Sequence, residues 1–140
     1  MTARDAIAAT AGVVPAIEII DSRIADWKIT LADTIADLAS SARVALGGPV
    51  VPIGGLDTRL IGCVMEQNGA VVATGAGAAA LGDPAEAVAW AANTLGALGV
   101  TMEAGAIVMT GALHASVPAQ AGDTFSASFD RLGSLSIRFV

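Results

Sequence analysis

The sequence predicts an α+β domain with a mixed, mainly antiparallel β-sheet and peripheral helices. Short apolar runs bounded by Gly and Pro recur along most of the chain, which is typical of short strands. Several of these runs flank tight turns of the kind that join antiparallel neighbours. Only one long helical segment is present, over residues 83–99. Strands that outnumber helices and follow one another in hairpins favour this class over an alternating parallel fold.

Composition limits the classes of protein that the chain can represent. With 140 residues, of which 54% are hydrophobic, the chain fits a single domain over residues 1–140. The net charge of −6 provides no basic patch for phosphates, so we expect no nucleic-acid partner. Cys63 is the only cysteine, which excludes an internal disulfide and fits a reducing cytoplasm. The uncharged run 104–122 is interrupted by Gly, His, Pro and Gln, so we expect no membrane span.

The first third of the chain predicts a short helix over residues 4–11 and a strand over residues 13–20. Glu18 lies inside the apolar sequence AIEII of that strand. A carboxylate in a buried strand is costly unless it is paired, hydrogen-bonded or bound to a metal. The residues alone leave two alternatives at similar weight, which are an ion pair with Arg23 or Arg43 and a metal site.

Charged residues are concentrated in the segment 15–43, which also holds the only lysine. We expect Asp21 and Arg23 to form a local ion pair in the turn after the strand. Lys28 is either a solvated side chain or a positive charge for a substrate carboxylate.

A helix is predicted over residues 29–41, because its apolar residues recur at helical spacing. Asp33 and Asp37 lie one turn apart on this helix, either on a solvated face or as a second carboxylate pair. Ser40 and Ser41 follow, and either could cap the chain or donate hydrogen bonds to an anion.

Turn and cap residues mark the middle of the chain. Asn68-Gly69 lies between the apolar runs 60–67 and 70–74 and predicts a hairpin, because both central residues of a type I′ turn need positive φ. Asp83-Pro84 followed by Glu86 predicts a helix start. Glycine at position 99 predicts where that helix ends.

The last third predicts a buried strand over residues 107–109 and a final hairpin over residues 125–139. Thr110 follows the first of these strands, in a loop position that often carries function, and could bind a substrate carboxylate. His114 is the only histidine, so a multi-histidine metal site is not supported and a surface position is expected.

Several long blocks of sequence occur in an order that resembles a known family. They are PAIEIIDSRIADWKI, DTIAD, SSAR, GAVVATGAGAAALGDPAEAVAWAAN, and TGALHASVP with GD following. The chain resembles the hydratase/decarboxylase family of the fumarylacetoacetate hydrolase superfamily, which includes 2-hydroxypenta-2,4-dienoate hydratases and 4-oxalocrotonate decarboxylases. The resemblance covers the C-terminal half of such proteins and implies their rolled β fold, and we expect the family's N-terminal region to be absent. Leu38 stands where this family usually has asparagine.

The resemblance implies a lyase that adds water to a 2-hydroxy-2,4-dienoate to give a 4-hydroxy-2-oxo acid in aromatic or steroid ring degradation. It implies a divalent cation, Mg²⁺ or Mn²⁺, with Glu18 as a metal ligand. Lys28 and Asp33 are the candidate catalytic residues, and Ser40 and Thr110 are the candidate substrate-binding residues. The alternative within the family is decarboxylation of 4-oxalocrotonate.

A second alternative is a catalytically incomplete fragment or structural partner. The family's other two metal carboxylates form a Glu-x-Glu pair, and this chain contains no Glu-x-Glu. We expect a cytoplasmic homo-oligomer that binds a small 2-oxo or 2-hydroxy dienoate. A separate N-terminal half and a pathway decarboxylase are further possible partners.

Overall fold

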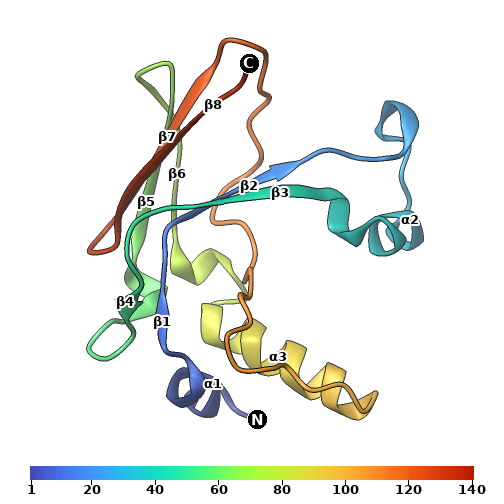
Figure 1. The fold of residues 1–140 in the computed structure, drawn as a ribbon, viewed down its shortest axis with the longest axis vertical. Helices are drawn as coiled ribbons and strands as arrows, with labels where there is room; N and C mark the ends of the chain where they lie inside the picture. The colour runs from blue at the N-terminus through green and yellow to red at the C-terminus, as the bar shows by residue number, and fades with distance from the viewer.

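The computed structural model describes residues 1–140 as antiparallel β-structure with helices at the periphery (Figure 1). In chain order the elements are α1 (Ala3–Ala9), β1 (Gly12–Val13), β2 (Ala16–Ile20), α2 (Leu31–Ala36), β3 (Ser41–Leu46), β4 (Val51–Pro52), β5 (Gly62–Gln67), β6 (Ala70–Ala76), α3 (Pro84–Ala97), β7 (Thr124–Phe129) and β8 (Gly133–Arg138). Short 3₁₀ turns connect some of them, including Ala25–Trp27 and Leu38–Ser40.

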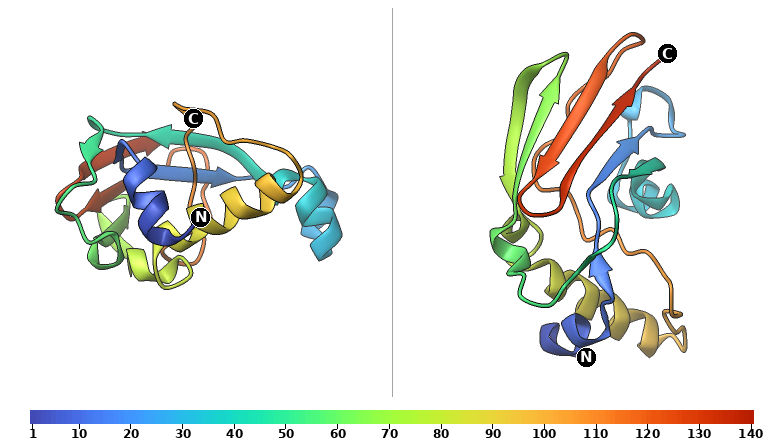
Figure 2. Two further views of the ribbon diagram at one scale, coloured as in Figure 1. Left: turned by 90° about the horizontal axis from the view of Figure 1, so that it is seen from below. Right: turned by 60° about the vertical axis from the view of Figure 1, so that its left-hand side comes forward.

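Every strand pair is antiparallel, which confirms the predicted fold class. A four-stranded sheet has the order β6-β5-β7-β8, and two further pairs are β2-β3 and β1-β4. The β2-β3 ribbon crosses beside the four-stranded sheet, while α1 and α3 lie together at one end and α2 projects from the other end of the ribbon (Figures 1 and 2). The register between β2 and β3 shifts between Ile19 and Ile20.

A small core joins the ribbon to the sheet. Ile17 of β2 packs with Met65, Phe125 and Ala127, which come from β5 and β7. Phe139 adds an edge-to-face contact with Phe125, with ring centroids 5.7 Å apart. Because Ile17 anchors β2 in this core, the next residue of the strand, Glu18, is held at a fixed place beside the sheet.

The turn and cap signals of the sequence are confirmed. Asn68 and Gly69 have φ of 53° and 83°, as the hairpin between β5 and β6 requires. The side chain of Asp83 accepts a hydrogen bond from the amide of Ala85 and caps α3. At its end, Gly99 has φ of 74° and the amide of the next residue bonds back to the carbonyl of Leu95, which is a Schellman motif.

Three expected elements differ from the structure. The strand predicted over 13–20 is divided at Pro15, so that β1 pairs with β4 and β2 pairs with β3. Proline cannot donate a ladder hydrogen bond, which explains the change of partner. The helix predicted over 29–41 is shorter, because α2 is followed by a left-handed turn at residues 38–40.

The prediction of a buried strand over residues 107–109 is wrong. These residues pair with no strand and are exposed, and the side chain of Ile107 is 67% accessible. An apolar run shows that its side chains avoid water, but it does not show which surface of the same chain could cover them.

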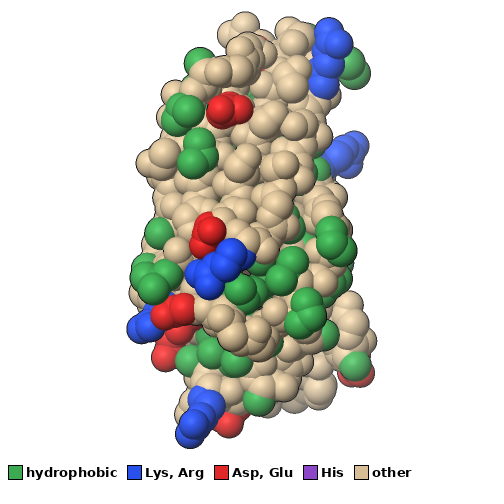
Figure 3. Space-filling model, turned by 90° about the vertical axis from the view of Figure 1, so that its left-hand side faces the viewer, with side chains coloured by type: hydrophobic (Ala, Val, Ile, Leu, Met, Phe, Trp, Pro, Cys, Tyr) green, Lys and Arg blue, Asp and Glu red, His purple; other side chains and the backbone are tan.

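Much apolar surface remains uncovered on the molecule. Only 16 of the 140 residues are buried, whereas large hydrophobic side chains such as Leu31, Leu60, Trp90 and Leu98 are exposed. Figure 3 shows hydrophobic side chains gathered over the lower half of one face, between charged groups. None of the helices has both the length and the apolar character needed to cross a bilayer.

Candidate metal and substrate site

A largely apolar cavity of about 770 Å³ lies between β2, the four-stranded sheet and the segment that rises from α3 to β7. Of the 30 residues that line it, 21 are hydrophobic. A concave apolar pocket with a few polar groups is the usual form of a small-molecule site. The titratable side chains that line it are Glu18, Asp21, Cys63 and His114.

Glu18 brings an uncompensated carboxylate to this cavity. Its strand neighbour Ile17 is buried in the core, and its partner across the β2-β3 ladder is Val44. The side chain is half-buried and forms neither an ion pair nor a hydrogen bond. The alternative of a salt bridge with Arg23 or Arg43 is therefore not what the structure contains. A hard oxygen ligand remains free at the cavity wall.

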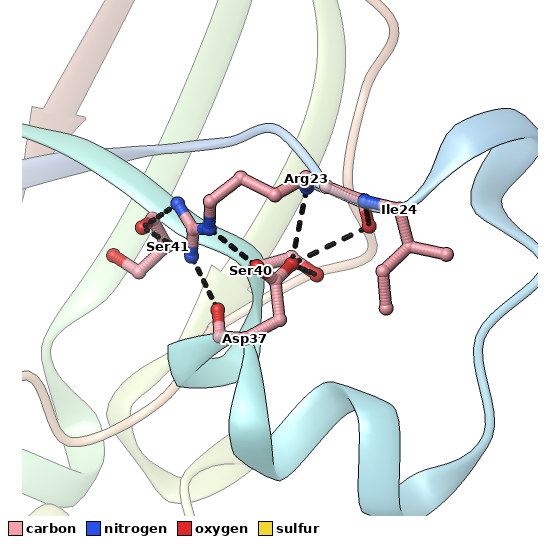
Figure 4. Close-up of polar contacts among 6 residues, drawn as sticks. Arg23, Ile24, Asp37, Ser40 and Ser41 are labelled. Atoms are coloured by element: carbon pink, nitrogen blue, oxygen red, sulfur yellow. Dashed lines mark hydrogen bonds and ion pairs between the residues drawn. The ribbon is translucent and has the colours of Figure 1, made fainter.

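Arg23 pairs with Asp37 rather than with Asp21, which corrects the expected ion pair (Figure 4). The guanidinium contacts both the carboxylate and the carbonyl of Asp37, and its Nη1 donates to the carbonyl of Ser41 at 3.2 Å. The backbone amide of Arg23 and the hydroxyl of Ser40 also donate to the Asp37 carboxylate, at 3.2 and 3.1 Å. A guanidinium that donates to one carboxylate oxygen and to two backbone carbonyls is a stronger arrangement than a pair of sequence neighbours in a turn.

This network closes the base of an arm formed by residues 22–40. Burial alone would raise the pKa of Asp37, but the hydrogen bonds from Arg23 and Ser40 outweigh burial and lower the pKa from its ordinary value. The backbone adds a further bond, from the amide of Asp21 to the carbonyl of Ser40 at 2.9 Å. Leu38, Ala39 and Ser40 have φ of 54°, 56° and 57°, so the chain leaves the arm through a left-handed turn.

The candidate catalytic residues Lys28 and Asp33 lie on this arm and do not line the cavity. Lys28 is 79% exposed and pairs with Asp26 at 3.2 Å. The carboxylate of Asp33 accepts hydrogen bonds from the amide and hydroxyl of Thr30, at 2.9 and 2.7 Å, and so caps α2. These bonds lower the pKa of Asp33.

The two candidate substrate-binding residues are in different places. Thr110 lines the cavity that holds Glu18, in the segment after α3. Ser40 is buried at the base of the arm, where its hydroxyl donates to Asp37, and it does not line the cavity. The structure therefore brings Glu18 and Thr110 to one cavity and leaves Lys28, Asp33 and Ser40 outside it.

Sequence reasoning did not assign Asp21, Trp27 or His114 to the site, although all three line the cavity. Asp21 looked like half of a turn ion pair, and nothing in the sequence pattern distinguishes Trp27. His114 had one available signal, since it is the only imidazole of the chain and follows Thr110 in a Gly-containing loop.

The residues of this chain fit a divalent metal in part. Glu18 is an oxygen donor without a competing cation, which suits Mg²⁺ or Mn²⁺. However, no three His, Cys, Asp or Glu side chains of the chain gather closely enough to hold an ion. Glu18 therefore offers one oxygen donor and not a complete site.

Comparison with known proteins identifies the family. The model of the fumarylacetoacetate (FAA) hydrolase C-terminal family matches residues 1–140. A 2-hydroxyhexa-2,4-dienoate hydratase of Comamonas testosteroni is 45% identical over 100% of this chain and 53% of its own length. A 4-oxalocrotonate decarboxylase of a Pseudomonas species is 46% identical over 96% of this chain and 51% of its own, and a 2-keto-4-pentenoate hydratase of Paraburkholderia xenovorans is 43% identical over 99% and 51%.

Solved structures agree with this assignment. The 4-oxalocrotonate decarboxylase from Pseudomonas putida G7, complexed with magnesium and adipate, has a TM-score of 0.95 and 43% identity, and the match covers 99% of this chain and 53% of that one. The same enzyme complexed with calcium and acetate has a TM-score of 0.92. The rolled antiparallel fold expected from the resemblance is thereby confirmed. The chain spans about half the length of the relatives it matches, and it belongs to the fumarylacetoacetate hydrolase C-terminal family.

Proposed function

We propose that the protein is a metal-dependent hydro-lyase. It adds water to a 2-hydroxy-2,4-dienoate and gives a 4-hydroxy-2-oxo acid in the degradation of aromatic or steroid rings. The observation that carries the proposal is the unpaired Glu18 carboxylate in an apolar cavity, in a chain 45% identical to a named dienoate hydratase. The substrate is a short apolar chain with a polar carboxylate end, which matches a pocket of this character.

Glu18 is the proposed ligand of Mg²⁺ or Mn²⁺. When bound, such a cation supplies Lewis-acid polarisation of the substrate's 2-oxo group. The apolar residues around the cavity exclude water from the hydrocarbon part of the substrate. Thr110 is the proposed hydrogen-bond donor to the substrate carboxylate, and it lies in the cavity with Glu18.

The roles proposed for Lys28, Asp33 and Ser40 have less structural support, because none of these residues lines the cavity. Trp27 of the arm 22–40 already lines the cavity. Catalytic roles for Lys28 and Asp33, and a substrate-binding role for Ser40, require these three side chains to reach the cavity as well when the substrate binds. Substitution of Lys28 by Ala should then lower turnover without changing metal affinity.

The decarboxylation of 4-oxalocrotonate is the second candidate reaction. It is supported by the relative at 46% identity that carries this name and by the structural match at TM-score 0.95. Release of CO₂ from 4-oxalocrotonate, compared with loss of diene absorbance from a 2-hydroxy-2,4-dienoate, distinguishes the two reactions in the same preparation.

A catalytically incomplete fragment is the third candidate, and it is favoured by the absence of three gathered metal ligands. The uncovered apolar surface supports assembly, either as a homo-oligomer or with a separate N-terminal half or a pathway decarboxylase. Light scattering of the purified chain tests the homo-oligomer. We propose a cytoplasmic location, for which the single buried thiol is the support.

Turnover of a 2-hydroxy-2,4-dienoate tests the main proposal, in the presence of Mn²⁺ and of the part of a 2-keto-4-pentenoate hydratase that this chain does not match. We expect loss of diene absorbance that needs both the metal and Glu18. Consumption of the dienoate by Glu18→Gln at the wild-type rate would contradict the proposal, and so would release of CO₂ as the only activity.

A further inference from the structure

The loop that carries His114 is held at the cavity wall by a close approach to β6. A Cβ atom added at Gly75 would lie 2.2 Å from the carbonyl oxygen of Leu113, so only glycine permits this contact. The residue after Leu113 is His114, which is half-buried and lines the same cavity as Glu18. The backbone that precedes His114 is therefore held against β6, and the His114 side chain lines the cavity.

One hydrogen bond determines which ring nitrogen of His114 carries the proton. Nδ1 lies 2.7 Å from the carbonyl oxygen of Ala115. A carbonyl oxygen only accepts, so Nδ1 is the donor and bears the hydrogen. In the neutral ring Nε2 then has a lone pair and no partner in the chain, because no other hydrogen bond involves this side chain. The partner of Nε2 must therefore be a hydrogen-bond donor. Water or a hydroxyl group can donate, whereas a carboxylate cannot.

We propose that Nε2 of His114 accepts a hydrogen bond from the water that adds to C4 and takes its proton. This inference rests on the proposed hydratase function and assigns to it a proton-handling residue. Glu18 is the proposed ligand of the cation and is therefore not free to take this role. The thiol of Cys63 is less suited, because burial raises its pKa.

His114 both accepts and returns the proton that is transferred in the hydration step. Once the dienoate has taken its 2-oxo-3-enoate form, the water oxygen bonds to C4 and its proton passes to Nε2. The electron pair of the C3–C4 double bond moves towards the 2-oxo oxygen. Nε2 then returns the proton to C3, the 2-oxo group re-forms, and the imidazole is neutral again. The product is the 4-hydroxy-2-oxo acid, and no further reactant is needed.

The product and its deoxy analogue provide the test. 4-Hydroxy-2-oxopentanoate carries the added hydroxyl at C4, whereas 2-oxopentanoate lacks it and is otherwise the same ligand. Affinities for both are measured with Mn²⁺ and the part of a 2-keto-4-pentenoate hydratase that this chain does not match. The variants are the wild type, His114→Ala, His114→Gln and the control Gln120→Ala, whose side chain lies in the same segment and forms no hydrogen bond. ¹⁵N spectra are unambiguous here, since the chain has one histidine.

We expect His114→Ala to lower the affinity for the hydroxy acid about threefold to tenfold, which corresponds to the loss of one neutral hydrogen bond. The affinity for 2-oxopentanoate should not change. The Nδ1–H tautomer should appear in the wild-type spectrum, and its Nε2 signal should move with the hydroxy acid alone. His114→Gln, which keeps a polar atom near the Nε2 position, should recover part of the affinity, and Gln120→Ala should behave as wild type.

Equal losses for both ligands, or an Nε2–H tautomer, would overturn the inference while the hydratase function stands. Failure of the wild type to bind either ligand would instead remove the hydratase function and the inference with it. If His114→Ala does not fold, the wild-type spectra with the two ligands still decide the question.

Discussion

At the scale of single residues, Glu18 is a partly buried carboxylate without a partner, which is an unfavourable arrangement unless the side chain has a function. It is half-buried beside an apolar cavity, and it has no partner. We predict that Glu18→Gln lowers Mn²⁺ affinity about tenfold or more, because a neutral amide is a poor ligand for a hard cation. Thermal stability should stay equal or rise, because a partly desolvated charge is removed.

Glu66→Gln is the matched control for this prediction. Glu66 is also a half-buried glutamate on a strand, β5, but it does not line the cavity. Calorimetric titration with Mn²⁺ and a thermal melt of both variants give the comparison. Equal metal affinities for the two variants would show that Glu18 is not a ligand.

Leu38 is held in a conformation that leucine disfavours. It has φ of 54° and its side chain is 75% exposed, so little packing compensates the strain. We predict that Leu38→Asn stabilises the chain by up to about 1 kcal/mol, because asparagine visits the left-handed region more readily. Urea unfolding measures the change. Leu31→Asn, at a similarly exposed position inside α2, should not stabilise the chain.

Asp37 should make stability depend on acidity. Burial alone would raise its pKa, but hydrogen bonds from Arg23 and Ser40 outweigh burial and lower the pKa from the ordinary value of an aspartate. A lowered folded pKa means that the stabilisation is complete above the unfolded pKa and is lost as pH falls through the folded pKa. Melting temperatures between pH 7 and the acid range should therefore fall less for Asp37→Asn than for wild type, from a lower starting value. Asp130→Asn, at an exposed position next to Arg131, should keep the wild-type slope.

At the scale of elements, the sequence predicted those features that depend on local chemistry. Asp83 and Gly99 define α3, and Asn68-Gly69 defines the β5-β6 hairpin, because caps and turns are determined by the residues that form them. The ion pair of Arg23 was predicted wrongly, since its partner Asp37 is near in space and distant in sequence. The strand predicted over residues 107–109 was wrong for the same reason, because strand pairing depends on a neighbouring strand that this short apolar run does not specify.

The β5-β6 turn gives a direct test of backbone conformation. Gly69 has φ of 83°, and a Cβ added there would meet no atom within 4 Å. We predict that Gly69→Ala costs about 1–2 kcal/mol from strain alone. Gly54→Ala is the control, because that site is equally open and has no positive φ. Chemical denaturation of both variants decides this, and a neutral Gly69→Ala would contradict the type of turn.

At the scale of the whole molecule, the site residues that have local sequence signals could be predicted, whereas those placed by contacts between distant segments could not. The sequence indicated Glu18 and Thr110, which lie in one cavity, because an isolated carboxylate in an apolar strand and a polar residue after an apolar run are local signals. The place of His114 in that cavity depends on the contact between Gly75 and Leu113, which no sequence pattern contains. Few residues are buried and many large apolar side chains are exposed, so this chain does not cover its own apolar surface.

The metal site gives the prediction that belongs to this scale. The 140-residue chain brings no three ligands together, and it spans about half the length of its relatives. We predict that this chain alone binds Mn²⁺ weakly and turns over dienoate poorly. Mg²⁺ and Mn²⁺ prefer a nearly octahedral set of oxygens, and one carboxylate leaves most of that set to water.

Addition of the part of a 2-keto-4-pentenoate hydratase that this chain does not match should raise both metal affinity and turnover. Calorimetry with Mn²⁺ and loss of diene absorbance measure the two effects. The Glu18→Gln chain mixed with the same segment should gain neither, because the ligand on this side of the site is then missing. Tight metal binding and rapid turnover by the isolated chain would mean instead that a second carboxylate completes the site without a partner. Asp21 is the other carboxylate that lines the cavity.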